Sequence, residues 1–224
     1  MKTLSLRKKS LIALLLVFVP STLLIFIGTR SCEHNFTKLD DYGKIHNYTF
    51  TNINGENKNS DDFKNTIVII NTLQESCPKK CGIAFWPFER SIYQKIMKNQ
   101  KKLNKVRIIS FVIDEDGNPV KDLSNMQQIL KDNVLNYDPK LWILASGDPK
   151  KIFNIEHNGV NLLDTQTEDK KKTAYKDLIL LVDKKNHLRM ALRANSKSPE
   201  GEGITRRMKQ SLALLIKQYD KEKK

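Results

Sequence analysis

Three apolar runs, separated by polar and charged stretches, dominate the pattern of the chain after residue 45. Their sequences are TIVIIN at 66–71, VRIISFVI at 106–113 and LILLV at 178–182, and the first two are rich in β-branched residues. Runs of this length and composition are typical of strands that are buried on both faces of a sheet. The pattern therefore predicts a sheet with these three segments at its centre.

Weaker signals predict the remaining elements. Alternation over residues 47–53 predicts a strand that ends at an Asn54-Gly55 turn, and residues 187–193 are predicted to form a hairpin with the last buried run. Apolar residues at helical spacing predict three helices, at 83–103, 123–134 and 204–219, and a short strand is predicted at 141–145. This order predicts an α/β, thioredoxin-like fold, in which helices flank a central mixed sheet.

The first apolar run, Leu11 to Gly28, has a different character because it carries no charge over eighteen residues. As a helix it would extend about 27 Å at about 1.5 Å per residue, which is close to the thickness of a bilayer core. Four cations precede it, at Lys2, Arg7, Lys8 and Lys9. The positive-inside rule therefore predicts a single-pass protein of the inner (cytoplasmic) membrane, with its N-terminus in the cytoplasm and its domain in the periplasm.

Two other interpretations of this run are a cleaved signal peptide and a lipoprotein signal that ends at Cys32. The apolar core is long for a signal peptide, and Thr29-Arg30-Ser31 suits neither kind of cleavage. An uncleaved anchor is therefore favoured. The predicted organisation is a cytoplasmic N-terminus at 1–9, a transmembrane helix at 10–29, a polar linker at 30–45, a thioredoxin-like domain at 46–219 and a basic tail at 220–224.

Composition adds a strongly basic balance to this picture. The 224-residue chain has a formal net charge of +14. Its lysines are scattered in pairs and triplets and do not form one stripe with aromatic residues between them, which argues against nucleic acid as a partner. The charge is therefore attributed to a solvated, lysine-rich surface.

The candidate chemistry lies in Cys77 and Cys81, between a buried strand and the helix that follows it. A helix N-terminus and the adjacent Lys79 and Lys80 would stabilise a thiolate. The spacing allows either a disulfide or a two-thiolate Cu(I) site, whereas a purely structural disulfide would gain little from so short a loop. We predict a redox-active or metal-binding pair and, by analogy with other thioredoxin-like proteins, Cys77 as the attacking thiol and Cys81 as the resolving thiol.

These features resemble the Sco/SenC family, whose members are membrane-anchored, thioredoxin-fold assembly factors for the copper centre of cytochrome c oxidase. The resemblance covers about residues 46–218. The segments that carry it are the Cys-Pro-x-x-x-Cys motif, Ser110–Asp114 (SFVID), Trp142–Gly147 (WILASG) and Leu181-Val182-Asp183 before a turn. It implies copper held by the two cysteines and one histidine, and a cysteine-containing membrane or exported protein, such as an oxidase subunit, as the partner.

The chain departs from the family pattern at the third copper ligand. The expected histidine position, about eight residues before Asp183, is occupied by Tyr175. His157 is kept as a substitute ligand because it lies in a long irregular segment, while the other three histidines (His34, His46 and His187) are predicted to be surface residues. This departure shifts the expected role from copper delivery toward thiol–disulfide exchange, which needs no histidine.

Three functions are compatible with the sequence. The first is a Sco-like protein that performs thiol–disulfide exchange, Cu(I) delivery or both during oxidase assembly. The second is a general extracytoplasmic thiol–disulfide oxidoreductase, and the third is a non-catalytic thioredoxin-like binding module. For the third, Trp86 is either a core residue or part of an apolar lip for a partner, whereas Phe85 and Phe88 are predicted to be core residues. Cys32 makes the cysteine count odd, and its fate is left open.

Overall fold

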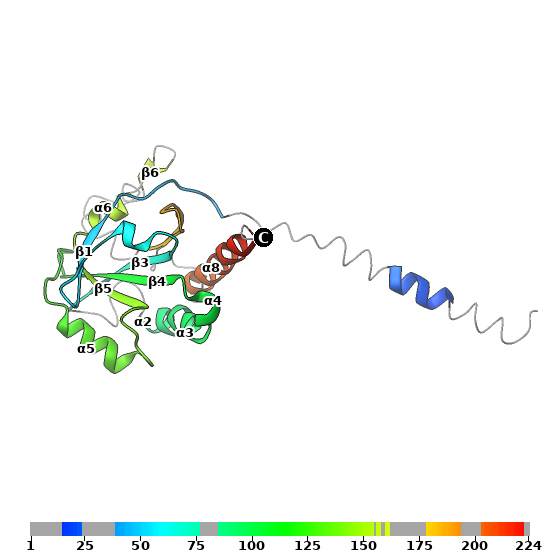
Figure 1. Cartoon of the computed structure of the whole chain (residues 1–224), viewed down its shortest axis with the longest axis horizontal. Helices are drawn as coiled ribbons and strands as arrows, with labels where there is room; N and C mark the ends of the chain where they lie inside the picture. The colour runs from blue at the N-terminus through cyan, green and yellow to red at the C-terminus, as the bar shows by residue number, and fades with distance from the viewer. Residues whose placement is uncertain are drawn as a thin grey trace, which may run out of the picture. The chain divides into compact units, whose positions relative to one another are not determined.

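The computed structural model describes residues 15–23, 39–76, 85–154, 156–157, 160–161, 178–193 and 203–221. The chain divides into two compact units between Thr37 and Lys38. In the first unit, residues 15–23 form a helix with exposed side chains, drawn in blue in Figure 1. Among the described residues, no helix combines the length and the apolar character that crossing a membrane would require.

The second unit is built on a seven-stranded mixed sheet with the strand order β2-β1-β5-β4-β3-β8-β9. Its strands are β1 (Thr49–Asn52), β2 (Asn57–Asn59), β3 (Ile67–Gln74), β4 (Val106–Ile113), β5 (Trp142–Ser146), β8 (Leu178–Val182) and β9 (Leu188–Arg193). β3, β4 and β5 are parallel, and β8 and β9 form an antiparallel hairpin against β3. A parallel β–helix–β unit followed by such a hairpin and a closing helix is the thioredoxin-like arrangement, which confirms the predicted fold class.

The helices depart from the predicted pattern in one segment. Residues 83–103 were expected to form one helix, but the structure divides this stretch into four parts, and five of its residues, Glu89–Tyr93, form a π-helical turn. The helical elements are η1 (Ser60–Phe63), α2 (Phe85–Phe88), η2 (Glu89–Tyr93), α3 (Gln94–Lys98), α4 (Gln100–Leu103), α5 (Ser124–Asn133), α6 (Lys150–Phe153) and α8 (Gly203–Lys221). A separate two-stranded pair consists of β6 (Glu156–His157) and β7 (Val160–Asn161).

The sheet has a hydrophobic core on each face. Along β3, Ile67 and Ile69 point into the core beneath α2–α4, α5 and α8, whereas Val68 and Ile70 point into the opposite core beneath α6. Figure 1 shows α2, α3, α4 and α5 together on one side of the sheet. Burial of both faces explains why the three central strands appear as continuous apolar runs and not as alternating ones.

Residues 39–45, here called the N-terminal strap, lie along the edge strand β9. The Tyr42 N–H donates to the Leu188 carbonyl at 2.9 Å, and the Leu188 N–H donates to the Gly43 carbonyl at 2.9 Å. Ile45 is buried in the core on the α6 side. The strap therefore covers hydrogen-bonding groups that β9 would otherwise present at the edge of the sheet.

Asp41 in the strap accepts a hydrogen bond from the ring of His187, with 2.9 Å between Nδ1 and Oδ2. This bond, followed by the Gly43 N–H, holds the pKa of Asp41 below its ordinary value of 3.8. A lowered folded-state pKa means that the stabilisation is present above pH 3.8 and is lost as the pH falls through the lowered value.

We therefore expect Asp41→Asn to lower the free energy of unfolding by less than about 1 kcal/mol near neutral pH, because Asp41 is solvent-exposed. The difference from the wild type should vanish below the lowered pKa of Asp41. Urea unfolding of both chains across the acid range checks this, with Asp40→Asn as the matched neighbour. A difference that is the same at every pH would show that the carboxylate is not the stabilising group.

Gly147 directly follows β5, beside the antiparallel neighbouring strand β1. A Cβ atom at this position would lie 2.8 Å from the Thr49 carbonyl oxygen and 3.1 Å from the Phe50 Cβ. We expect Gly147→Ala to destabilise the domain by about 1–3 kcal/mol, because the backbone of β1 must shift to make room. Thermal unfolding checks the prediction, with Ser146→Ala as the control, and an unchanged Tm would show that β1 moves freely.

Candidate functional site

The carboxyl ends of the parallel strands β3 and β4 lie side by side. Gln74, the last residue of β3, is paired with Ile113, the last residue of β4, and the Glu75 N–H donates to the Ile113 carbonyl at 2.9 Å. Cys77 follows two residues after Glu75 in the sequence. The segment 77–84, with Cys77 and Cys81, lies outside the described residues. The structure therefore describes the residues on either side of the pair, which end at Ser76 and resume at Phe85.

Side-chain hydrogen bonds hold the flank that leads to Cys77. Gln74 Nε2 donates to Ser76 Oγ at 3.0 Å, and Asn125 Nδ2, at the start of α5, donates to Glu75 Oε1 at 3.4 Å. Beside them, the turn after β4 is closed by the Asn118 N–H, which donates to Asp114 Oδ1 at 2.7 Å. That bond is the main cause of the lowered pKa of the Asp114 carboxyl group.

The flank that follows Cys81 is held by aromatic packing. Phe88 of α2 is buried, as predicted, and its ring lies edge-on to Trp142 with 5.5 Å between the centroids. The ring of Tyr93 is tilted against the same indole at 5.3 Å. Trp86 is 45% exposed, so it does not belong to the core, and the side chain of Phe85 lies outside the description. Trp86 therefore has the exposure that the lip interpretation requires.

Polar groups also tie η2 to the loop before β5. The Tyr93 hydroxyl donates to the Asn136 carbonyl at 2.6 Å and accepts from the Asp138 N–H at 2.8 Å. Burial is the main cause of the raised pKa of this phenol. The buried carboxylate of Glu89 accepts from Gln94 Nε2 at 2.6 Å. These contacts fix the helix that begins four residues after Cys81.

A buried polar network crosses three strands beneath α2. Trp142 Nε1 donates to Ser110 Oγ at 2.8 Å, and the Ser110 hydroxyl donates to Asn71 Oδ1. Asn71 is fully buried six residues before Cys77, and its Nδ2 has no hydrogen-bond partner among the described residues. Sequence reasoning missed Asn71 and Ser110 as a unit. Their signal was a polar residue in the interior of each of two largely apolar strands.

The histidines lie in different places. His187 lies in the β8–β9 turn against Asp41, and His46 is exposed. The backbone of His157 belongs to β6 and is paired with Val160, while its side chain, together with Tyr175, His34 and Cys32, lies outside the description. Within the described ranges no three His, Cys, Asp or Glu side chains are grouped so that they could hold a metal ion.

Comparison with family models and with curated proteins gave no match. Comparison with solved structures gave many matches. The soluble domain of Sco1 from Bacillus subtilis is 17% identical, with 80% of this chain and 98% of that chain covered and a TM-score of 0.47. ScoI from Bradyrhizobium japonicum with copper bound is 22% identical, with 74% and 99% covered and a TM-score of 0.42.

This chain is structurally similar to Sco proteins. The matches also include a putative electron transfer protein from Aquifex aeolicus, which is 12% identical, with 73% of this chain and 92% of that chain covered and a TM-score of 0.47. The fold assignment rests on the strand order and directions of the sheet itself.

Proposed function

We propose that the chain is a membrane-anchored thiol–disulfide exchange protein whose reactive pair is Cys77 and Cys81. The observation that carries the proposal is the fold of the two flanks between which the pair lies in the sequence. β3, an interior strand of a thioredoxin-like sheet, ends three residues before Cys77, and a helical run from Phe85 to Lys98 follows Cys81. Function is disproportionately found on loops that a rigid scaffold positions, and both flanks here are fixed by hydrogen bonds and aromatic packing.

The proposed reaction starts from the reduced pair. The Cys77 thiolate attacks one sulfur of a substrate disulfide, and the departing substrate sulfur takes up a proton. Cys81 then loses its proton and attacks the Cys77 sulfur, which releases the second substrate thiol. The substrate gains two electrons and two protons, and Cys77 and Cys81 become a disulfide. Lys79 and Lys80 favour the thiolate form of the attacking sulfur.

The sequence resemblance to the Sco/SenC family supports a cysteine pair of an oxidase subunit as the substrate. The same two thiols form a donor set that suits Cu(I), which makes copper delivery the second candidate, with copper as cargo. Tyr175 at the expected histidine position favours exchange over delivery. We further propose that residues 10–29 anchor the chain in the inner membrane and that the domain acts in the periplasm.

Trapping of a mixed disulfide tests the exchange reaction on the full chain in detergent or nanodiscs. A Cys81→Ser variant should accumulate a mixed disulfide with an oxidised dicysteine peptide, because the resolving thiol is gone. Cys77→Ser should accumulate none, and Cys32→Ser should react as the wild type does. Equal trapping by the Cys77→Ser and Cys81→Ser variants would contradict the assigned roles.

Titration of the reduced chain with Cu(I), against a competing chelator, separates the two candidate functions. A one-to-one complex that is lost in Cys77→Ser would favour delivery, whereas a measurable dithiol potential without a complex would favour exchange. If replacement of both cysteines left the cellular phenotype of the chain unchanged, the chain would be a binding module and both candidates would fail.

A further inference from the structure

A lysine-lined cleft of about 430 Å³ lies at the amino-terminal edge of the parallel strands. Its floor includes Ile67 and Val106, which are the first residues of β3 and β4 and are paired with each other. The chain leaves β3 toward Cys77 at the other end of these eight-residue strands. The cleft therefore lies at the amino-terminal ends of the parallel strands, and the thiol pair follows their carboxyl-terminal ends.

The charged groups of the cleft come from four separate parts of the chain. Lys101 belongs to α4, Lys105 immediately precedes β4, and Lys184 lies in the β8–β9 turn with its Nζ 4.0 Å from the centre of the Tyr219 ring. Asp220 near the end of α8 supplies the one carboxylate among the lining residues. Three ammonium groups against one carboxylate leave the cleft positively charged, so it fits an anionic partner.

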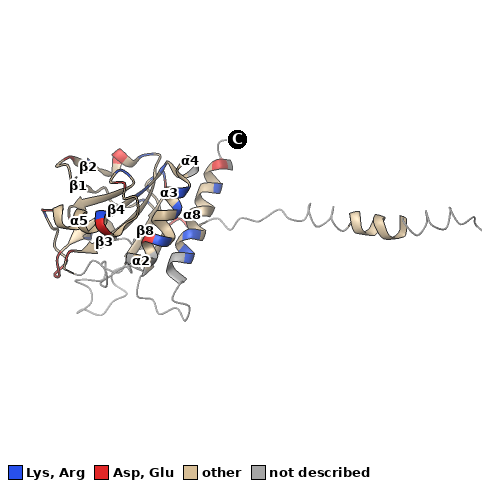
Figure 2. Ribbon diagram, turned by 90° about the horizontal axis from the view of Figure 1, so that it is seen from below, with Lys and Arg blue, Asp and Glu red and all other residues tan. Residues whose placement is uncertain are grey.

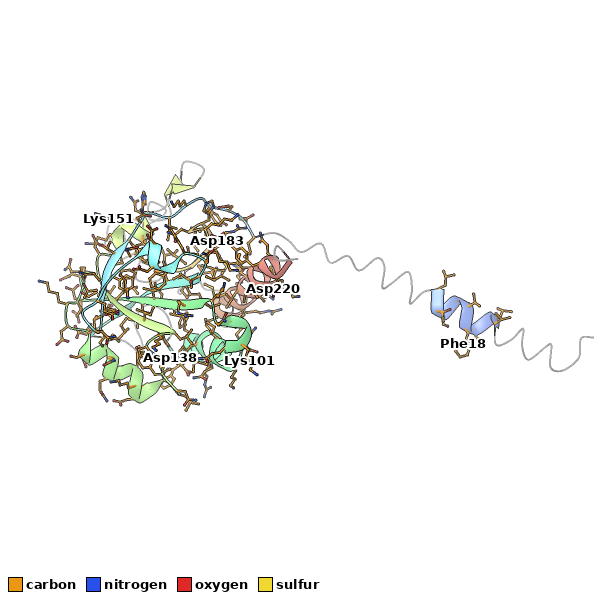
Figure 3. The ribbon with its side chains drawn as sticks, in the orientation of Figure 1. Phe18, Lys101, Asp138, Lys151, Asp183 and Asp220 are labelled. Carbon is orange, nitrogen blue, oxygen red and sulfur yellow. The ribbon has the colours of Figure 1, made fainter. Side chains whose placement is uncertain are left out.

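The positive charge continues beyond the cleft on α3 and α8. Lys98 and Lys217 are exposed and lie three residues before Lys101 and Asp220 in sequence. Figure 2 shows Lys and Arg on α3 and α8, and Figure 3 shows Lys101 and Asp220 far from Lys151. Exposed lysines are thus found on α3 and α8 as well as in the cleft, so the positive charge is not confined to one small anion site.

The N-terminal strap reaches the domain at the same edge. Arg189 donates to the Leu39 carbonyl at 2.6 Å and to the Asp40 carbonyl at 2.9 Å, and its guanidinium also pairs with Asp183, which immediately precedes Lys184. Ten residues separate Gly28, the end of the apolar run, from Leu39. Ten extended residues span at most about 36 Å. A bilayer that holds the apolar run would therefore be within short reach of this edge.

We propose that the lysine-lined cleft docks on the anionic phospholipid headgroups of the bilayer in which the chain is anchored. Lysine ammonium groups bind phosphate as compact point charges, and basic segments next to a membrane are attracted by its anionic lipids. Docking at the amino-terminal edge turns the opposite edge, from which the chain leads to Cys77 and Cys81, away from the bilayer. The proposal rests on the membrane anchor and is independent of the thiol chemistry.

Lysine acetylation of the full chain in nanodiscs tests this docking. The rate is measured with neutral N-acetoxysuccinimide and peptide mass spectrometry, in discs of phosphatidylcholine alone and in discs that also contain phosphatidylglycerol. Lys101 and Lys105 should react at least about threefold more slowly in the anionic discs, and about 0.5 M salt should remove the difference. Lys121 and Lys151, which follow the carboxyl ends of β4 and β5, should react equally in both.

Charge reversal supplies the matched control. The double variant Lys101→Glu with Lys105→Glu should lose the protection of Lys184, while Lys121→Glu with Lys151→Glu should keep it, and circular dichroism checks that both are folded.

Equal rates in the two kinds of disc would overturn the proposal. So would protection by inorganic phosphate in neutral discs, which would identify a small-anion site. Failure of the chain to remain in discs would refute the anchor, and the mixed-disulfide assay reports on the thiols separately.

Discussion

Replacing Trp142 by alanine is expected to lower the free energy of unfolding by about 3–5 kcal/mol, the usual cost of removing a fully buried aromatic side chain. Trp142 is completely buried, and its indole contacts the rings of Phe88 and Tyr93. The same change removes the donor to Ser110 Oγ at the start of the buried polar network. Urea unfolding measures the loss, and a loss below about 1 kcal/mol would mean that the indole does not organise this core.

Two milder variants separate packing from hydrogen bonding at Trp142. Trp142→Phe keeps an aromatic ring but removes Nε1, and Ser110→Ala removes the oxygen that accepts from it. We expect each single change to cost about 1–3 kcal/mol, because a buried polar partner is left unpaired. The double variant should cost less than the sum of the two, since the Trp142 Nε1 donor and its acceptor are removed together, whereas strict additivity would show that the two groups do not interact.

Replacing Arg189 by methionine is expected to destabilise the domain by about 3–5 kcal/mol, because it leaves a buried carboxylate without its cation. Asp183 is only 3% exposed, and its Oδ2 lies 3.4 Å from Arg189 Nη1. The same guanidinium holds the strap by its bonds to the carbonyls of Leu39 and Asp40. The variant should therefore also release the strap, which hydrogen exchange at the Tyr42 and Ile45 amides would detect.

Matched substitutions test this assignment. Arg107 also donates to backbone carbonyls, at 2.6 Å to Asn104 and 2.8 Å to Val106, but pairs with no buried carboxylate among the described contacts. Arg107→Met should therefore cost far less than Arg189→Met. Arg189→Lys keeps the charge but cannot reproduce the planar fork, so an intermediate loss is expected. If Arg107→Met and Arg189→Met were equally harmful, the pairing with Asp183 would not be the cause.

The elements that the sequence predicted well are those with a local cause. The runs at 66–71, 106–113 and 178–182 became β3, β4 and β8, because strands buried on both faces need apolar side chains at every position. Helical spacing located α5 and α8 within a few residues for the same kind of reason. The position of the cysteine pair between β3 and a helix likewise follows from the order of elements along the chain.

The parts of the site that the sequence did not predict depend on contacts between distant segments. Asn71, Ser110 and Trp142 lie in three different strands. Only the register of β3, β4 and β5 brings them together as one network. The π-helical turn at Glu89–Tyr93 likewise has no local signal and is seen only once the helix is packed on the sheet.

The sequence by itself determined the thioredoxin-like order of elements, the apolar run before the domain, and the placement of Cys77 and Cys81 after the central strand. Only the tertiary structure decided that the strap 39–45 lies on β9 through Arg189, and that Lys101, Lys105 and Lys184 share one edge of the sheet. Periodicity records whether a residue is buried, which is a local property of an element. Periodicity does not show which distant residue lies beside a given residue, because those residues come together only through strand pairing and helix packing.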